Sequence, residues 1–567
     1  MNSSGNVPPE GSGCPLRVLV VTGSMLTPKE PSLLKALRKQ VEAVKASSGA
    51  WLDIEVKIQA LAHILAARAF RKSQRFARAP YRIAVQNFFT QSAAESDDPP
   101  EVTEVILVTL LHKEGVAFEV ATYAELYADD AKRDRLLAET HAVFASMTLL
   151  RDMSEVVPLV GMLKRPHNRV IAGGALAGIL HHAWPGCTGL DILAVGYGEL
   201  MVKELCDWMK GGFKDLQAPA RGRVIEMNRT QIVYSGVPEQ MDLDFLPSPD
   251  WELAMQVHDQ RFTHVNYESA RGCPYRCGFC NYPYLFDDTK FRYRSAKKIA
   301  EDWEHLYQLG VETITCLDSL FTMPRRRLIE LCNLLIAREV RLKWIGYARA
   351  DDLQDLEVCR LMKQAGCHQV QIGFESGSQR QLDNMNKHSG VAQNVRAMQN
   401  CREVGITTLA TVLIGFPGET AESVRESFEI LQSSPPDIYY VAPFNTRVEY
   451  VPILSPESRA KYGLRTYSDG RSSAPYWAHD SMSCTEVVDH VEWFHRQMME
   501  HRVALEGTLF YEGTLHYHPL QREALLDYQR DSLSQGRVLR KVLSWLRHAA
   551  NARLRKDIAR VFAAVSE

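Results

Sequence analysis

The stretch Arg271-Gly-Cys273-Pro-Tyr-Arg-Cys277-Gly-Phe-Cys280 places three cysteines within eight residues, in the spacing C-x3-C-x2-C. It directly follows a predicted strand at Val265–Ser269. Three thiolates on one loop can hold three irons of a cubane cluster, because thiolate is the ligand that such clusters use. A structural zinc site would need a fourth ligand close by, and no Cys or His follows within the next twenty residues. The spacing therefore predicts an iron–sulfur cluster rather than a zinc ion or three free thiols.

Strand and helix patterns alternate after this loop. Helical stretches separate further predicted strands at Thr313–Leu317, Leu342–Tyr347, Gln369–Phe374, Thr407–Ile414 and Ile438–Pro443. Strands that alternate with helices of this length predict a parallel sheet in an α/β fold. Six such units favour an open or partial (β/α)6 barrel over a Rossmann sheet.

The cysteine spacing, with the aromatic Phe279 before the last cysteine, resembles the signature of the radical S-adenosylmethionine (SAM) superfamily. In that family, the iron that has no cysteine ligand binds the amino and carboxylate groups of SAM. An electron from the cluster then cleaves SAM to a 5′-deoxyadenosyl radical. The resemblance covers about residues 262–445 and implies that a [4Fe–4S] cluster is held by Cys273, Cys277 and Cys280.

Three further motifs follow in the order that this family uses. They are Thr315-Cys-Leu-Asp318-Ser319-Leu-Phe321 after the second strand, Gly373-Phe-Glu375-Ser376-Gly377 after the fourth, and Leu413-Ile-Gly415-Phe-Pro-Gly418-Glu419 after the fifth. A single acidic residue at a strand end is often only a helix cap, but sites in parallel α/β folds gather at the carboxyl ends of strands. The resemblance implies SAM contacts at Phe279, Asp318, Ser319, Glu375, Ser376 and Gly415.

A first α/β alternation precedes the barrel, with strand patterns at Arg17–Gly23, Val116–Ala121, Val143–Thr148, Arg169–Ala172 and Ile192–Val195. Gly-rich turns follow its last two strands. Small residues there let a planar macrocycle approach the backbone closely, although such turns also occur as ordinary strand–helix connections. The turns resemble the last two signatures of a cobalamin-binding domain, which precedes the barrel in one branch of radical SAM proteins. That resemblance implies cobalamin contacts at Gly173, Gly174, Gly196, Tyr197, Gly198 and Glu199.

The sequence departs from many cobalamin-binding domains in one respect. Those domains carry Asp-x-His-x-x-Gly, whose histidine ligates cobalt, whereas His112 and Gly115 here have Leu110 in place of the aspartate. His112 also lies in a predicted helix, so we interpret it as a surface residue and expect cobalamin without a histidine ligand. Arg68 or Arg71 could lie below the cobalt, although a solvated helix face explains these arginines as well.

The predicted organisation begins with a flexible tail at 1–15 and a Rossmann-like cobalamin-binding domain at 16–210, with a helical insertion at 24–100. A connector at 211–262, a partial radical SAM barrel at 263–445 and a mainly helical substrate-recognition region at 446–567 follow. Candidate substrate contacts, which could equally be packing residues, are Tyr440, Asn445, Arg447, Trp477 and His479. The nine cysteines outside the loop are interpreted as core or incidental residues.

The composition excludes several classes of protein. Lys and Arg number 66 against 68 Asp and Glu, and a net charge of −2 gives no electrostatic footprint for nucleic acid. No apolar run approaches the roughly 20 residues of a membrane span, and the polar first residues show no signal-peptide pattern. We therefore expect a cytoplasmic protein, in which the twelve cysteines are thiols or metal ligands rather than a disulfide framework.

Together the resemblances imply a cobalamin-dependent radical SAM methyltransferase that uses a [4Fe–4S] cluster, SAM and methylcobalamin. It would move a methyl group to an unactivated carbon of a small molecule or peptide in secondary metabolism, such as antibiotic biosynthesis. The domain order is similar to that of the tryptophan methyltransferase of thiopeptide biosynthesis. The expected partner is an electron donor such as flavodoxin or ferredoxin. The alternatives are another cobalamin-binding radical SAM enzyme, such as a cyclase or ring-rearranging enzyme, and a non-enzymatic corrinoid-binding regulator.

Overall fold

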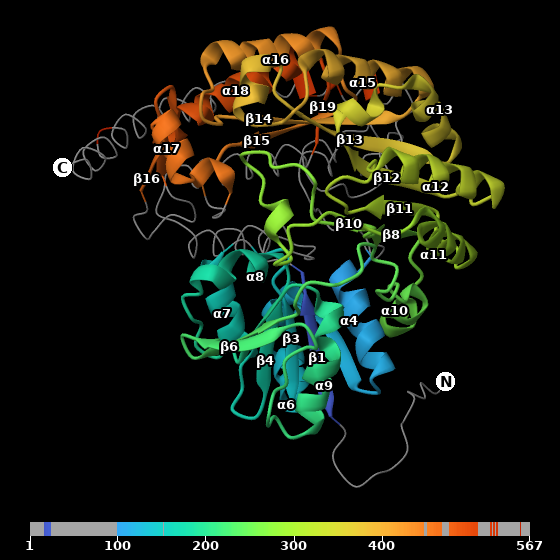
Figure 1. The fold of residues 1–567 in the computed structure, drawn as a ribbon, viewed down its shortest axis with the longest axis vertical. Helices are drawn as coiled ribbons and strands as arrows, with labels where there is room; N and C mark the ends of the chain where they lie inside the picture. The colour runs from blue at the N-terminus through green and yellow to red at the C-terminus, as the bar shows by residue number, and fades with distance from the viewer. Residues whose placement is uncertain are drawn as a thin grey trace.

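The computed structural model describes residues 16–23, 99–150, 152–446, 451–467 and 476–507, with residues 522–523, 526–527, 529–530 and 556 near the end of the chain. The described residues do not include the predicted tail at 1–15, almost all of the predicted insertion with Arg68 and Arg71, Arg447, or most of the predicted helical region after residue 507. The described chain is mixed α/β and contains two seven-stranded sheets, one in each of two bodies stacked along the long axis (Figure 1).

The first sheet has the strand order β2-β1-β3-β4-β5-β7-β6, and only the pairing of β6 with β7 is antiparallel. Its strands are β1 (Arg17–Thr22), β2 (Ala117–Thr122), β3 (Ala142–Ser146), β4 (Arg169–Gly173), β5 (Ile192–Val195), β6 (Arg223–Met227) and β7 (Thr230–Tyr234). Along β1, Val18 and Val20 pack into one core while Leu19 and Val21 pack into another. Both faces of the sheet are therefore buried, as the β-branched strand patterns predicted.

Helices cover these two faces. One core is formed with α4 (Val102–Lys113) and α9 (Val202–Lys210), and the other with α5 (Tyr123–Ala128), α6 (Asp130–Ala138), α7 (Met153–Leu163) and α8 (Ala175–Leu180). His112 is exposed on α4, as predicted. The segment predicted as a connector contributes the β6–β7 hairpin, which extends the edge of the first sheet beyond β5.

The second sheet has the order β19-β15-β14-β13-β12-β11-β8, and all its pairings are parallel. Its strands are β8 (His264–Tyr267), β11 (Thr313–Cys316), β12 (Lys343–Ala348), β13 (Cys367–Glu375), β14 (Thr407–Ile414), β15 (Ile438–Pro443) and β19 (Leu505–Glu506). The first six are the strands predicted for a partial (β/α)6 barrel, with ends that differ by at most two residues. The seventh, β19, comes from the C-terminal region and pairs with β15.

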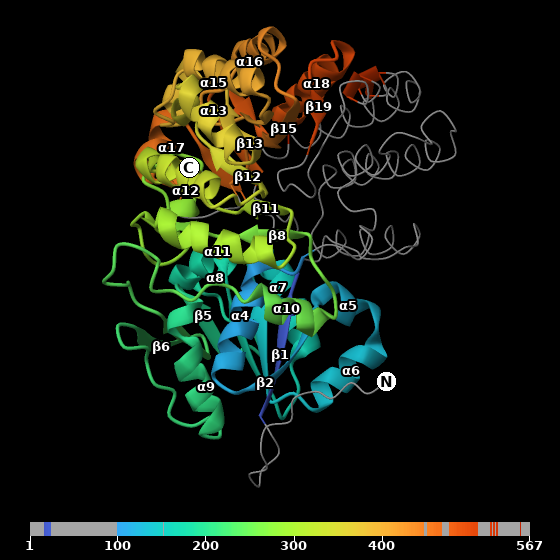
Figure 2. The same ribbon diagram turned by 90° about the vertical axis from the view of Figure 1, so that its right-hand side faces the viewer.

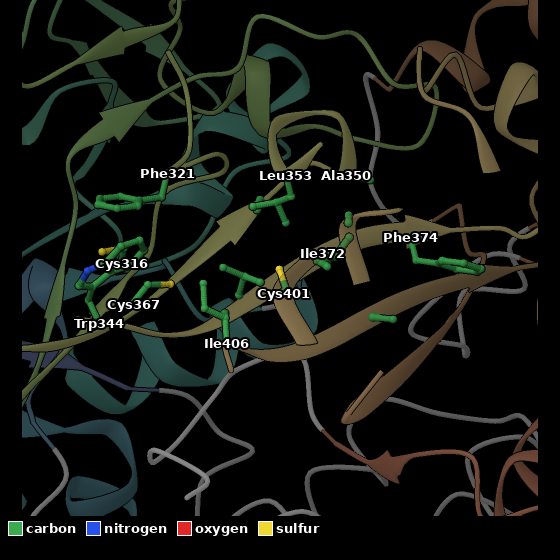
Figure 3. Close-up of a cluster of buried hydrophobic side chains, with 14 of the residues drawn as sticks. Cys316, Phe321, Trp344, Ala350, Leu353, Cys367, Ile372, Phe374, Cys401 and Ile406 are labelled. Carbon is green, nitrogen blue, oxygen red and sulfur yellow. The ribbon is translucent and has the colours of Figure 1, made fainter. Parts of the chain in front are cut away.

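Helices pack against the outer face of the second sheet (Figures 1 and 2). They are α11 (Ala296–Gln308), α12 (Arg325–Ala337), α13 (Leu356–Gln364), α14 (Gln379–Asn384), α15 (Val391–Val404) and α16 (Ala421–Ser433). Figure 3 shows part of the buried core between these helices and the strands, with Phe321 and Trp344 close to Cys316. Trp303 of α11 lies parallel to Phe321 at 5.8 Å between ring centres and is fully buried.

The C-terminal region was predicted to be mainly helical, and its described part contains the helices α17 (Pro456–Tyr462) and α18 (Cys484–Glu500). Its described part also contains a small antiparallel sheet of β16 (Arg465–Tyr467), β17 (Tyr476–His479) and β18 (Met482–Ser483). These strands are too short to show a clear alternation of apolar and polar residues. No helix in the described ranges is long and apolar enough to cross a membrane.

Helix α4 joins the two bodies. Val108 and Leu111 belong to the core of the first sheet, whereas Val102 and Val105 pack into the core of the second, beside α10 (Trp251–His258). The Nε2 atom of His258 lies 2.6 Å from the carboxylate of Glu104 across this contact. The two sheets are therefore parts of one packed structure rather than separate units on a flexible linker.

Trp303→Ala should lower the free energy of unfolding by about 3–5 kcal/mol, because it leaves a large cavity beside Phe321 and Trp344. Tyr307→Ala, on the exposed side of the same helix, is the control and should cost less than about 1 kcal/mol. Urea unfolding followed by circular dichroism measures both. Equal losses for the two variants would contradict the assignment of this face of α11 to the core.

Candidate active site

The cysteines lie on a loop of residues 272–291, which is closed at its base by a short antiparallel pair. The pair is β9 (Ala270–Arg271) with β10 (Arg292–Tyr293), directly after β8. The end of β11 supports this base, because the carboxylate of Asp318 accepts hydrogen bonds from the amides of Ser269 at 2.6 Å and Ala270 at 2.9 Å. The hydroxyl of Ser319 donates to the carbonyl oxygen of Gly272 at 2.8 Å.

Segments far along the chain hold the other side of the loop. The amide of Gly278 donates to the carbonyl oxygen of Met385 at 2.8 Å, and the amide of Ile453 donates to the carbonyl oxygen of Gly278 at 3.0 Å. Phe279 contacts Phe416 edge to face, with ring centres 6.2 Å apart. The loop is therefore fixed from three sides, which orders the positions of its thiols.

The three thiols share one electrostatic environment. Cys277 is buried, while Cys273 and Cys280 are half-buried, and none forms a disulfide. Burial raises the pKa of Cys280 to about 12 and also raises that of Cys277, and the neighbouring thiols act in the same direction. Among the described residues, no three Cys, His, Asp or Glu side chains are close enough to share a single metal ion. A cubane cluster differs from a zinc site in this respect, because each of its thiolates binds its own iron.

A buried ion pair lies beside these thiols. The ammonium group of Lys387 donates to the carboxylate of Glu375 at 2.7 Å, and both side chains are almost fully buried. Burial by itself lowers the pKa of Lys387, but Glu375 offsets this and holds it above its ordinary value. The charge of Lys387 in turn acts to lower the pKa of Cys277 and Cys280. A set of thiolates needs such a cation in a buried site.

Glu375 reaches this position through an irregularity in β13. The pairing register between β13 and β14 shifts between Gly373 and Glu375, and Glu375 has a φ of 57°. The shift places the Glu375 carboxylate over the same face of the sheet as Gly373, where a side chain on Gly373 would meet the ammonium group of Lys387 at 2.6 Å. The motif around Glu375 is visible in the sequence, but nothing there marks Lys387.

The residues predicted to contact SAM all lie at the carboxyl ends of β11, β13 and β14 or on the cysteine loop. Glu375 and Phe279 are directly beside Lys387. The hydroxyl of Ser376 is buried against that of Ser427 at 3.2 Å, and Asp318 and Ser319 are taken up by the base of the loop. Gly415 lies beneath the C-terminal region. The predicted residues therefore share one edge of the sheet, but several of them support the loop.

The predicted substrate contacts occupy different environments. Trp477 is buried, and the ring of His479 stacks on it at 5.4 Å with an interplanar angle of 7°. The Nε2 atom of His479 lies 3.2 Å from the carbonyl oxygen of Gly415, and burial lowers the pKa of this imidazole. Tyr440 is half-buried on β15, and Asn445 is exposed just after that strand. Trp477 and His479 thus form a packed cover over the turn at Gly415.

The two Gly-rich turns of the first sheet lie at its carboxyl edge. Gly174 and Gly196 have φ values of 112° and 105°, and side chains at these positions would collide with the hydroxyl groups of Thr148 and Ser235. Gly173 ends β4, and a side chain on Gly198 would meet no atom within 4 Å. Small and hydroxyl-bearing residues therefore meet at this edge, where Thr148 and Ser235 pack directly against Gly174 and Gly196.

The turn after β5 joins this edge to the base of the cysteine loop. The carboxylate of Glu199 accepts two hydrogen bonds from the guanidinium of Arg271, at 2.6 and 3.0 Å. Glu268 binds the same guanidinium at 2.8 Å, and all three side chains are largely buried. The hydroxyl of Tyr197 donates to Asp288 at 3.0 Å. Two of the residues predicted to contact cobalamin therefore connect the two bodies.

Residues 267–431 match the sequence model of the family described as the radical SAM superfamily. The chain contains a radical SAM domain. The matched residues run from the last residue of β8 into α16, so they include the cysteine loop and the ends of β11, β13 and β14 around it. The resemblance that the cysteine spacing predicted is confirmed for this part of the chain.

Relatives and solved structures extend the comparison. An uncharacterized methyltransferase of Pyrococcus horikoshii is 28% identical over 252 residues, which is 43% of this chain and 53% of the relative. An anaerobic magnesium-protoporphyrin IX monomethyl ester cyclase of Rubrivivax gelatinosus is 29% identical over 282 residues, 47% of this chain and 49% of the relative. The chain thus spans about half the length of these curated relatives.

The fold extends beyond the radical SAM domain. The structure of the radical SAM methyltransferase TsrM from Kitasatospora setae, with cobalamin and a [4Fe–4S] cluster bound, has a TM-score of 0.62. Its sequence is 17% identical, and the match covers 77% of this chain and 98% of that one. The likeness shows that both α/β bodies of this chain have the arrangement found in that structure.

Glu199→Gln should loosen the loop of the radical SAM domain, because the Arg271 guanidinium stays buried but loses one of its two carboxylate partners. We expect backbone amides in residues 272–291 to exchange about tenfold faster in hydrogen–deuterium exchange mass spectrometry. Asp207→Asn, which breaks an exposed ion pair with Lys203, is the control and should leave the loop unchanged. Unchanged exchange in Glu199→Gln would contradict the assigned role of this pair.

Asp318→Asn tests how the carboxyl group that supports the loop base makes the stability of the protein depend on pH. Burial raises the pKa of Asp318 to about 6 from its ordinary value of 3.8. The folded state therefore keeps a proton in this window that the unfolded chain releases, so the stability contributed by this group falls as the pH rises through it. Between about pH 4 and about pH 7, the wild type should lose about 1–3 kcal/mol relative to Asp318→Asn. Urea unfolding across this range measures the difference, and parallel pH profiles would contradict it.

Proposed function

We propose that this protein is a cobalamin-dependent radical SAM methyltransferase. The observation that carries the proposal is the placement of the cysteine loop of the radical SAM domain against the carboxyl edge of the first sheet. Glu199 binds Arg271 there, and a side chain on Gly178 of α8 would collide with the backbone of Leu285. Two edges that suit cofactors thus lie side by side.

The cysteine loop fits an iron–sulfur cluster. Cys273, Cys277 and Cys280 would hold it, with Lys387 as the nearby buried cation. When bound, a [4Fe–4S] cluster supplies the electron that cleaves SAM. The protein itself contributes an ordered loop. Hydrogen bonds to Met385 and Ile453 hold the loop on one side, and the antiparallel pair of β9 and β10 closes its base.

SAM would be held by the groups at the strand ends around the loop. Glu375 offers a carboxylate to a ribose hydroxyl, and Phe279 and the turn at Gly415 provide apolar surface. Asp318, Ser319 and Ser376 would act indirectly, since their side chains already bind the loop base or α16. The packed cover of Trp477 and His479 over Gly415 would keep water from this side of the site.

The carboxyl edge of the first sheet fits a corrinoid in the same sense. Gly173, Gly174, Gly196 and Gly198 place no side chains at this edge, and the hydroxyl of Thr148 lies against Gly174. When bound, cobalamin supplies a cobalt centre that carries a methyl group. Tyr197 and Glu199 would not touch the corrin directly, because their side chains are bonded to Asp288 and Arg271. Their part is to set the distance between the two edges.

The methyl acceptor would be an unactivated carbon of a small molecule or peptide in secondary metabolism. A cytoplasmic electron donor such as flavodoxin or ferredoxin would serve the cluster. A second candidate is a cyclase that uses the same cofactors, which the likeness to the anaerobic magnesium-protoporphyrin IX monomethyl ester cyclase favours. The mass of the product separates the two, since only methyl transfer adds a methyl group.

Substituting Cys273, Cys277 or Cys280 by Ala should remove most of the bound iron and the formation of 5′-deoxyadenosine, because each thiolate binds one iron. Anaerobic preparation, iron analysis and visible absorption measure the cluster, and mass spectrometry measures extracted corrinoid and transfer of the labelled methyl group of SAM. Cys484→Ala, a half-buried thiol outside the loop, is the control.

Two results would contradict the proposal. A loop variant that keeps the full cluster spectrum would overturn the ligand assignment. Anaerobic protein that holds its cluster but never takes up cobalamin would exclude a corrinoid-dependent reaction, while leaving the radical SAM domain intact.

A further inference from the structure

A tyrosine of the cysteine loop is held by an arginine of the second sheet. Tyr275 lies between the first two cysteines of the loop, and the guanidinium carbon of Arg349 is 3.7 Å from the centre of its ring. Arg349 directly follows β12, and only 5% of it is exposed. A cation over an aromatic face is attracted most strongly where water is excluded. The contact therefore ties the loop to the end of an interior strand of the sheet.

The same guanidinium binds the segment that carries Lys387. Its Nη2 atom donates to the carbonyl oxygen of Lys387 at 2.6 Å and to that of His388 at 3.1 Å. The ammonium group of Lys387 binds Glu375 beside the thiols. One side chain therefore connects two parts of the site, which are the cysteine loop at Tyr275 and the backbone of the buried lysine.

Arg349 also brings a second buried positive charge close to the thiols. Burial raises the pKa of Cys277, and the charges of Lys387 and Arg349 both oppose that rise. Lys387 is balanced by Glu375, which is buried to a similar extent. The two charges of that pair therefore act on the loop from the same buried place.

The carboxylate that balances Arg349 is more exposed than the guanidinium. Asp351 accepts a hydrogen bond from Nε of Arg349 at 2.8 Å, and its side chain is 24% exposed, against 6% for that of Arg349. The next carboxylate, Asp352, binds the hydroxyl of Thr322 instead. Solvent screens an exposed charge more than a buried one. The pair of Arg349 and Asp351 therefore leaves a net positive potential at its buried end, where Arg349 contacts the loop.

Such a charge acts on a cluster that is bound to this loop. The potential of an iron–sulfur cluster is set in part by net charge, by hydrogen bonds to its sulfurs and by solvent exposure. Reduction of [4Fe–4S]2+ to [4Fe–4S]+ adds one electron from an external low-potential donor, and a buried cation favours the more negative, reduced form. We propose that Arg349 is a positioning residue that holds the loop through Tyr275 and raises the reduction potential of its cluster. This inference rests on the proposed function only for the presence of a cluster on the loop.

A redox titration of the cluster tests this role without turnover. The anaerobic full-length protein, reconstituted with iron and sulfide and free of SAM, is titrated with dithionite and redox mediators. The titration is made at pH 8, above the pKa of Asp352, which burial raises to about 6. Electron paramagnetic resonance measures the amount of reduced cluster at each potential.

Removal of either charge of the pair should shift the potential, in opposite directions. In Arg349→Met, the ratio of reduced to oxidised cluster at a fixed potential should fall about tenfold, which equals about 59 mV for one electron. In Asp351→Asn, the same ratio should rise about threefold, because solvent already screens part of the charge of this carboxylate. A residue with a purely structural role would not give shifts of opposite sign.

Two further variants separate charge from packing. Arg349→Lys keeps the charge but not the planar guanidinium, so it should retain most of the potential, while backbone amides in residues 272–291 exchange faster in hydrogen–deuterium exchange. Arg338→Met is the control and should change neither measurement, because Arg338 lies at the end of α12 and binds Glu304 of α11, on the outer helices. If Arg349→Met takes up no cluster, the potentials of Arg349→Lys and Asp351→Asn decide the outcome.

Three results would overturn the inference. They are an unchanged potential in Arg349→Met, a potential in Asp351→Asn that does not rise, and a loss in Arg349→Lys as large as that in Arg349→Met. Any of them, obtained with an intact cluster, refutes only the role of Arg349 and leaves the proposed function standing. Wild-type protein that takes up no cluster would refute the proposed function together with this inference.

Discussion

The ion pair in which Arg271 donates two hydrogen bonds to the Glu199 carboxylate is the contact on which the arrangement of the site depends. A buried guanidinium carries a large desolvation cost, which is offset only when its donors are met by well-placed acceptors. Here one carboxylate comes from the first body and the other, Glu268, from the segment just before the loop. These hydrogen bonds therefore fix the distance between the two bodies at Arg271, the residue directly before the cysteine loop. Arg292, on the opposite strand of the loop base, is fully buried and bonded to Asp288 in the same manner.

A second electrostatic constraint follows from placing three thiols on one partly buried loop. Negative charge on neighbouring thiols disfavours the thiolate forms of Cys277 and Cys280, and burial disfavours them further. Lys387 supplies the compensating charge, and Glu375 keeps the pKa of that lysine above its ordinary value although the side chain is buried. The irregular register of β13 is what brings Glu375 to this face. Local backbone irregularity and long-range charge balance are thus two parts of one arrangement.

Much of the fold could be predicted from the sequence, for identifiable reasons. The predicted strands of both sheets are short apolar-rich runs bounded by Gly or by polar turns, and the cysteine loop is marked by the spacing of its cysteines. Strands β16–β19 could not be predicted, because strands of two to four residues have no measurable period, and β19 also depends on a partner, β15, that lies far away in the sequence. The β6–β7 hairpin lay in a segment whose Pro-rich stretches favoured a connector.

The site was predicted less completely than the fold. Glu199 follows a Gly-rich turn, and the sequence cannot distinguish a carboxylate that meets a cofactor from one that binds Arg271, 72 residues away. Lys387 carries no local signal. The hydrogen bonds that hold the cysteine loop also affect the order of events while the protein is made on the ribosome. Gly278 is held by Met385 and by Ile453, so a ribosome must complete nearly the whole second sheet before the loop acquires its final form. The ordered form of the loop is therefore reached only late in the synthesis of the chain, and a cluster that requires this form would enter after that point.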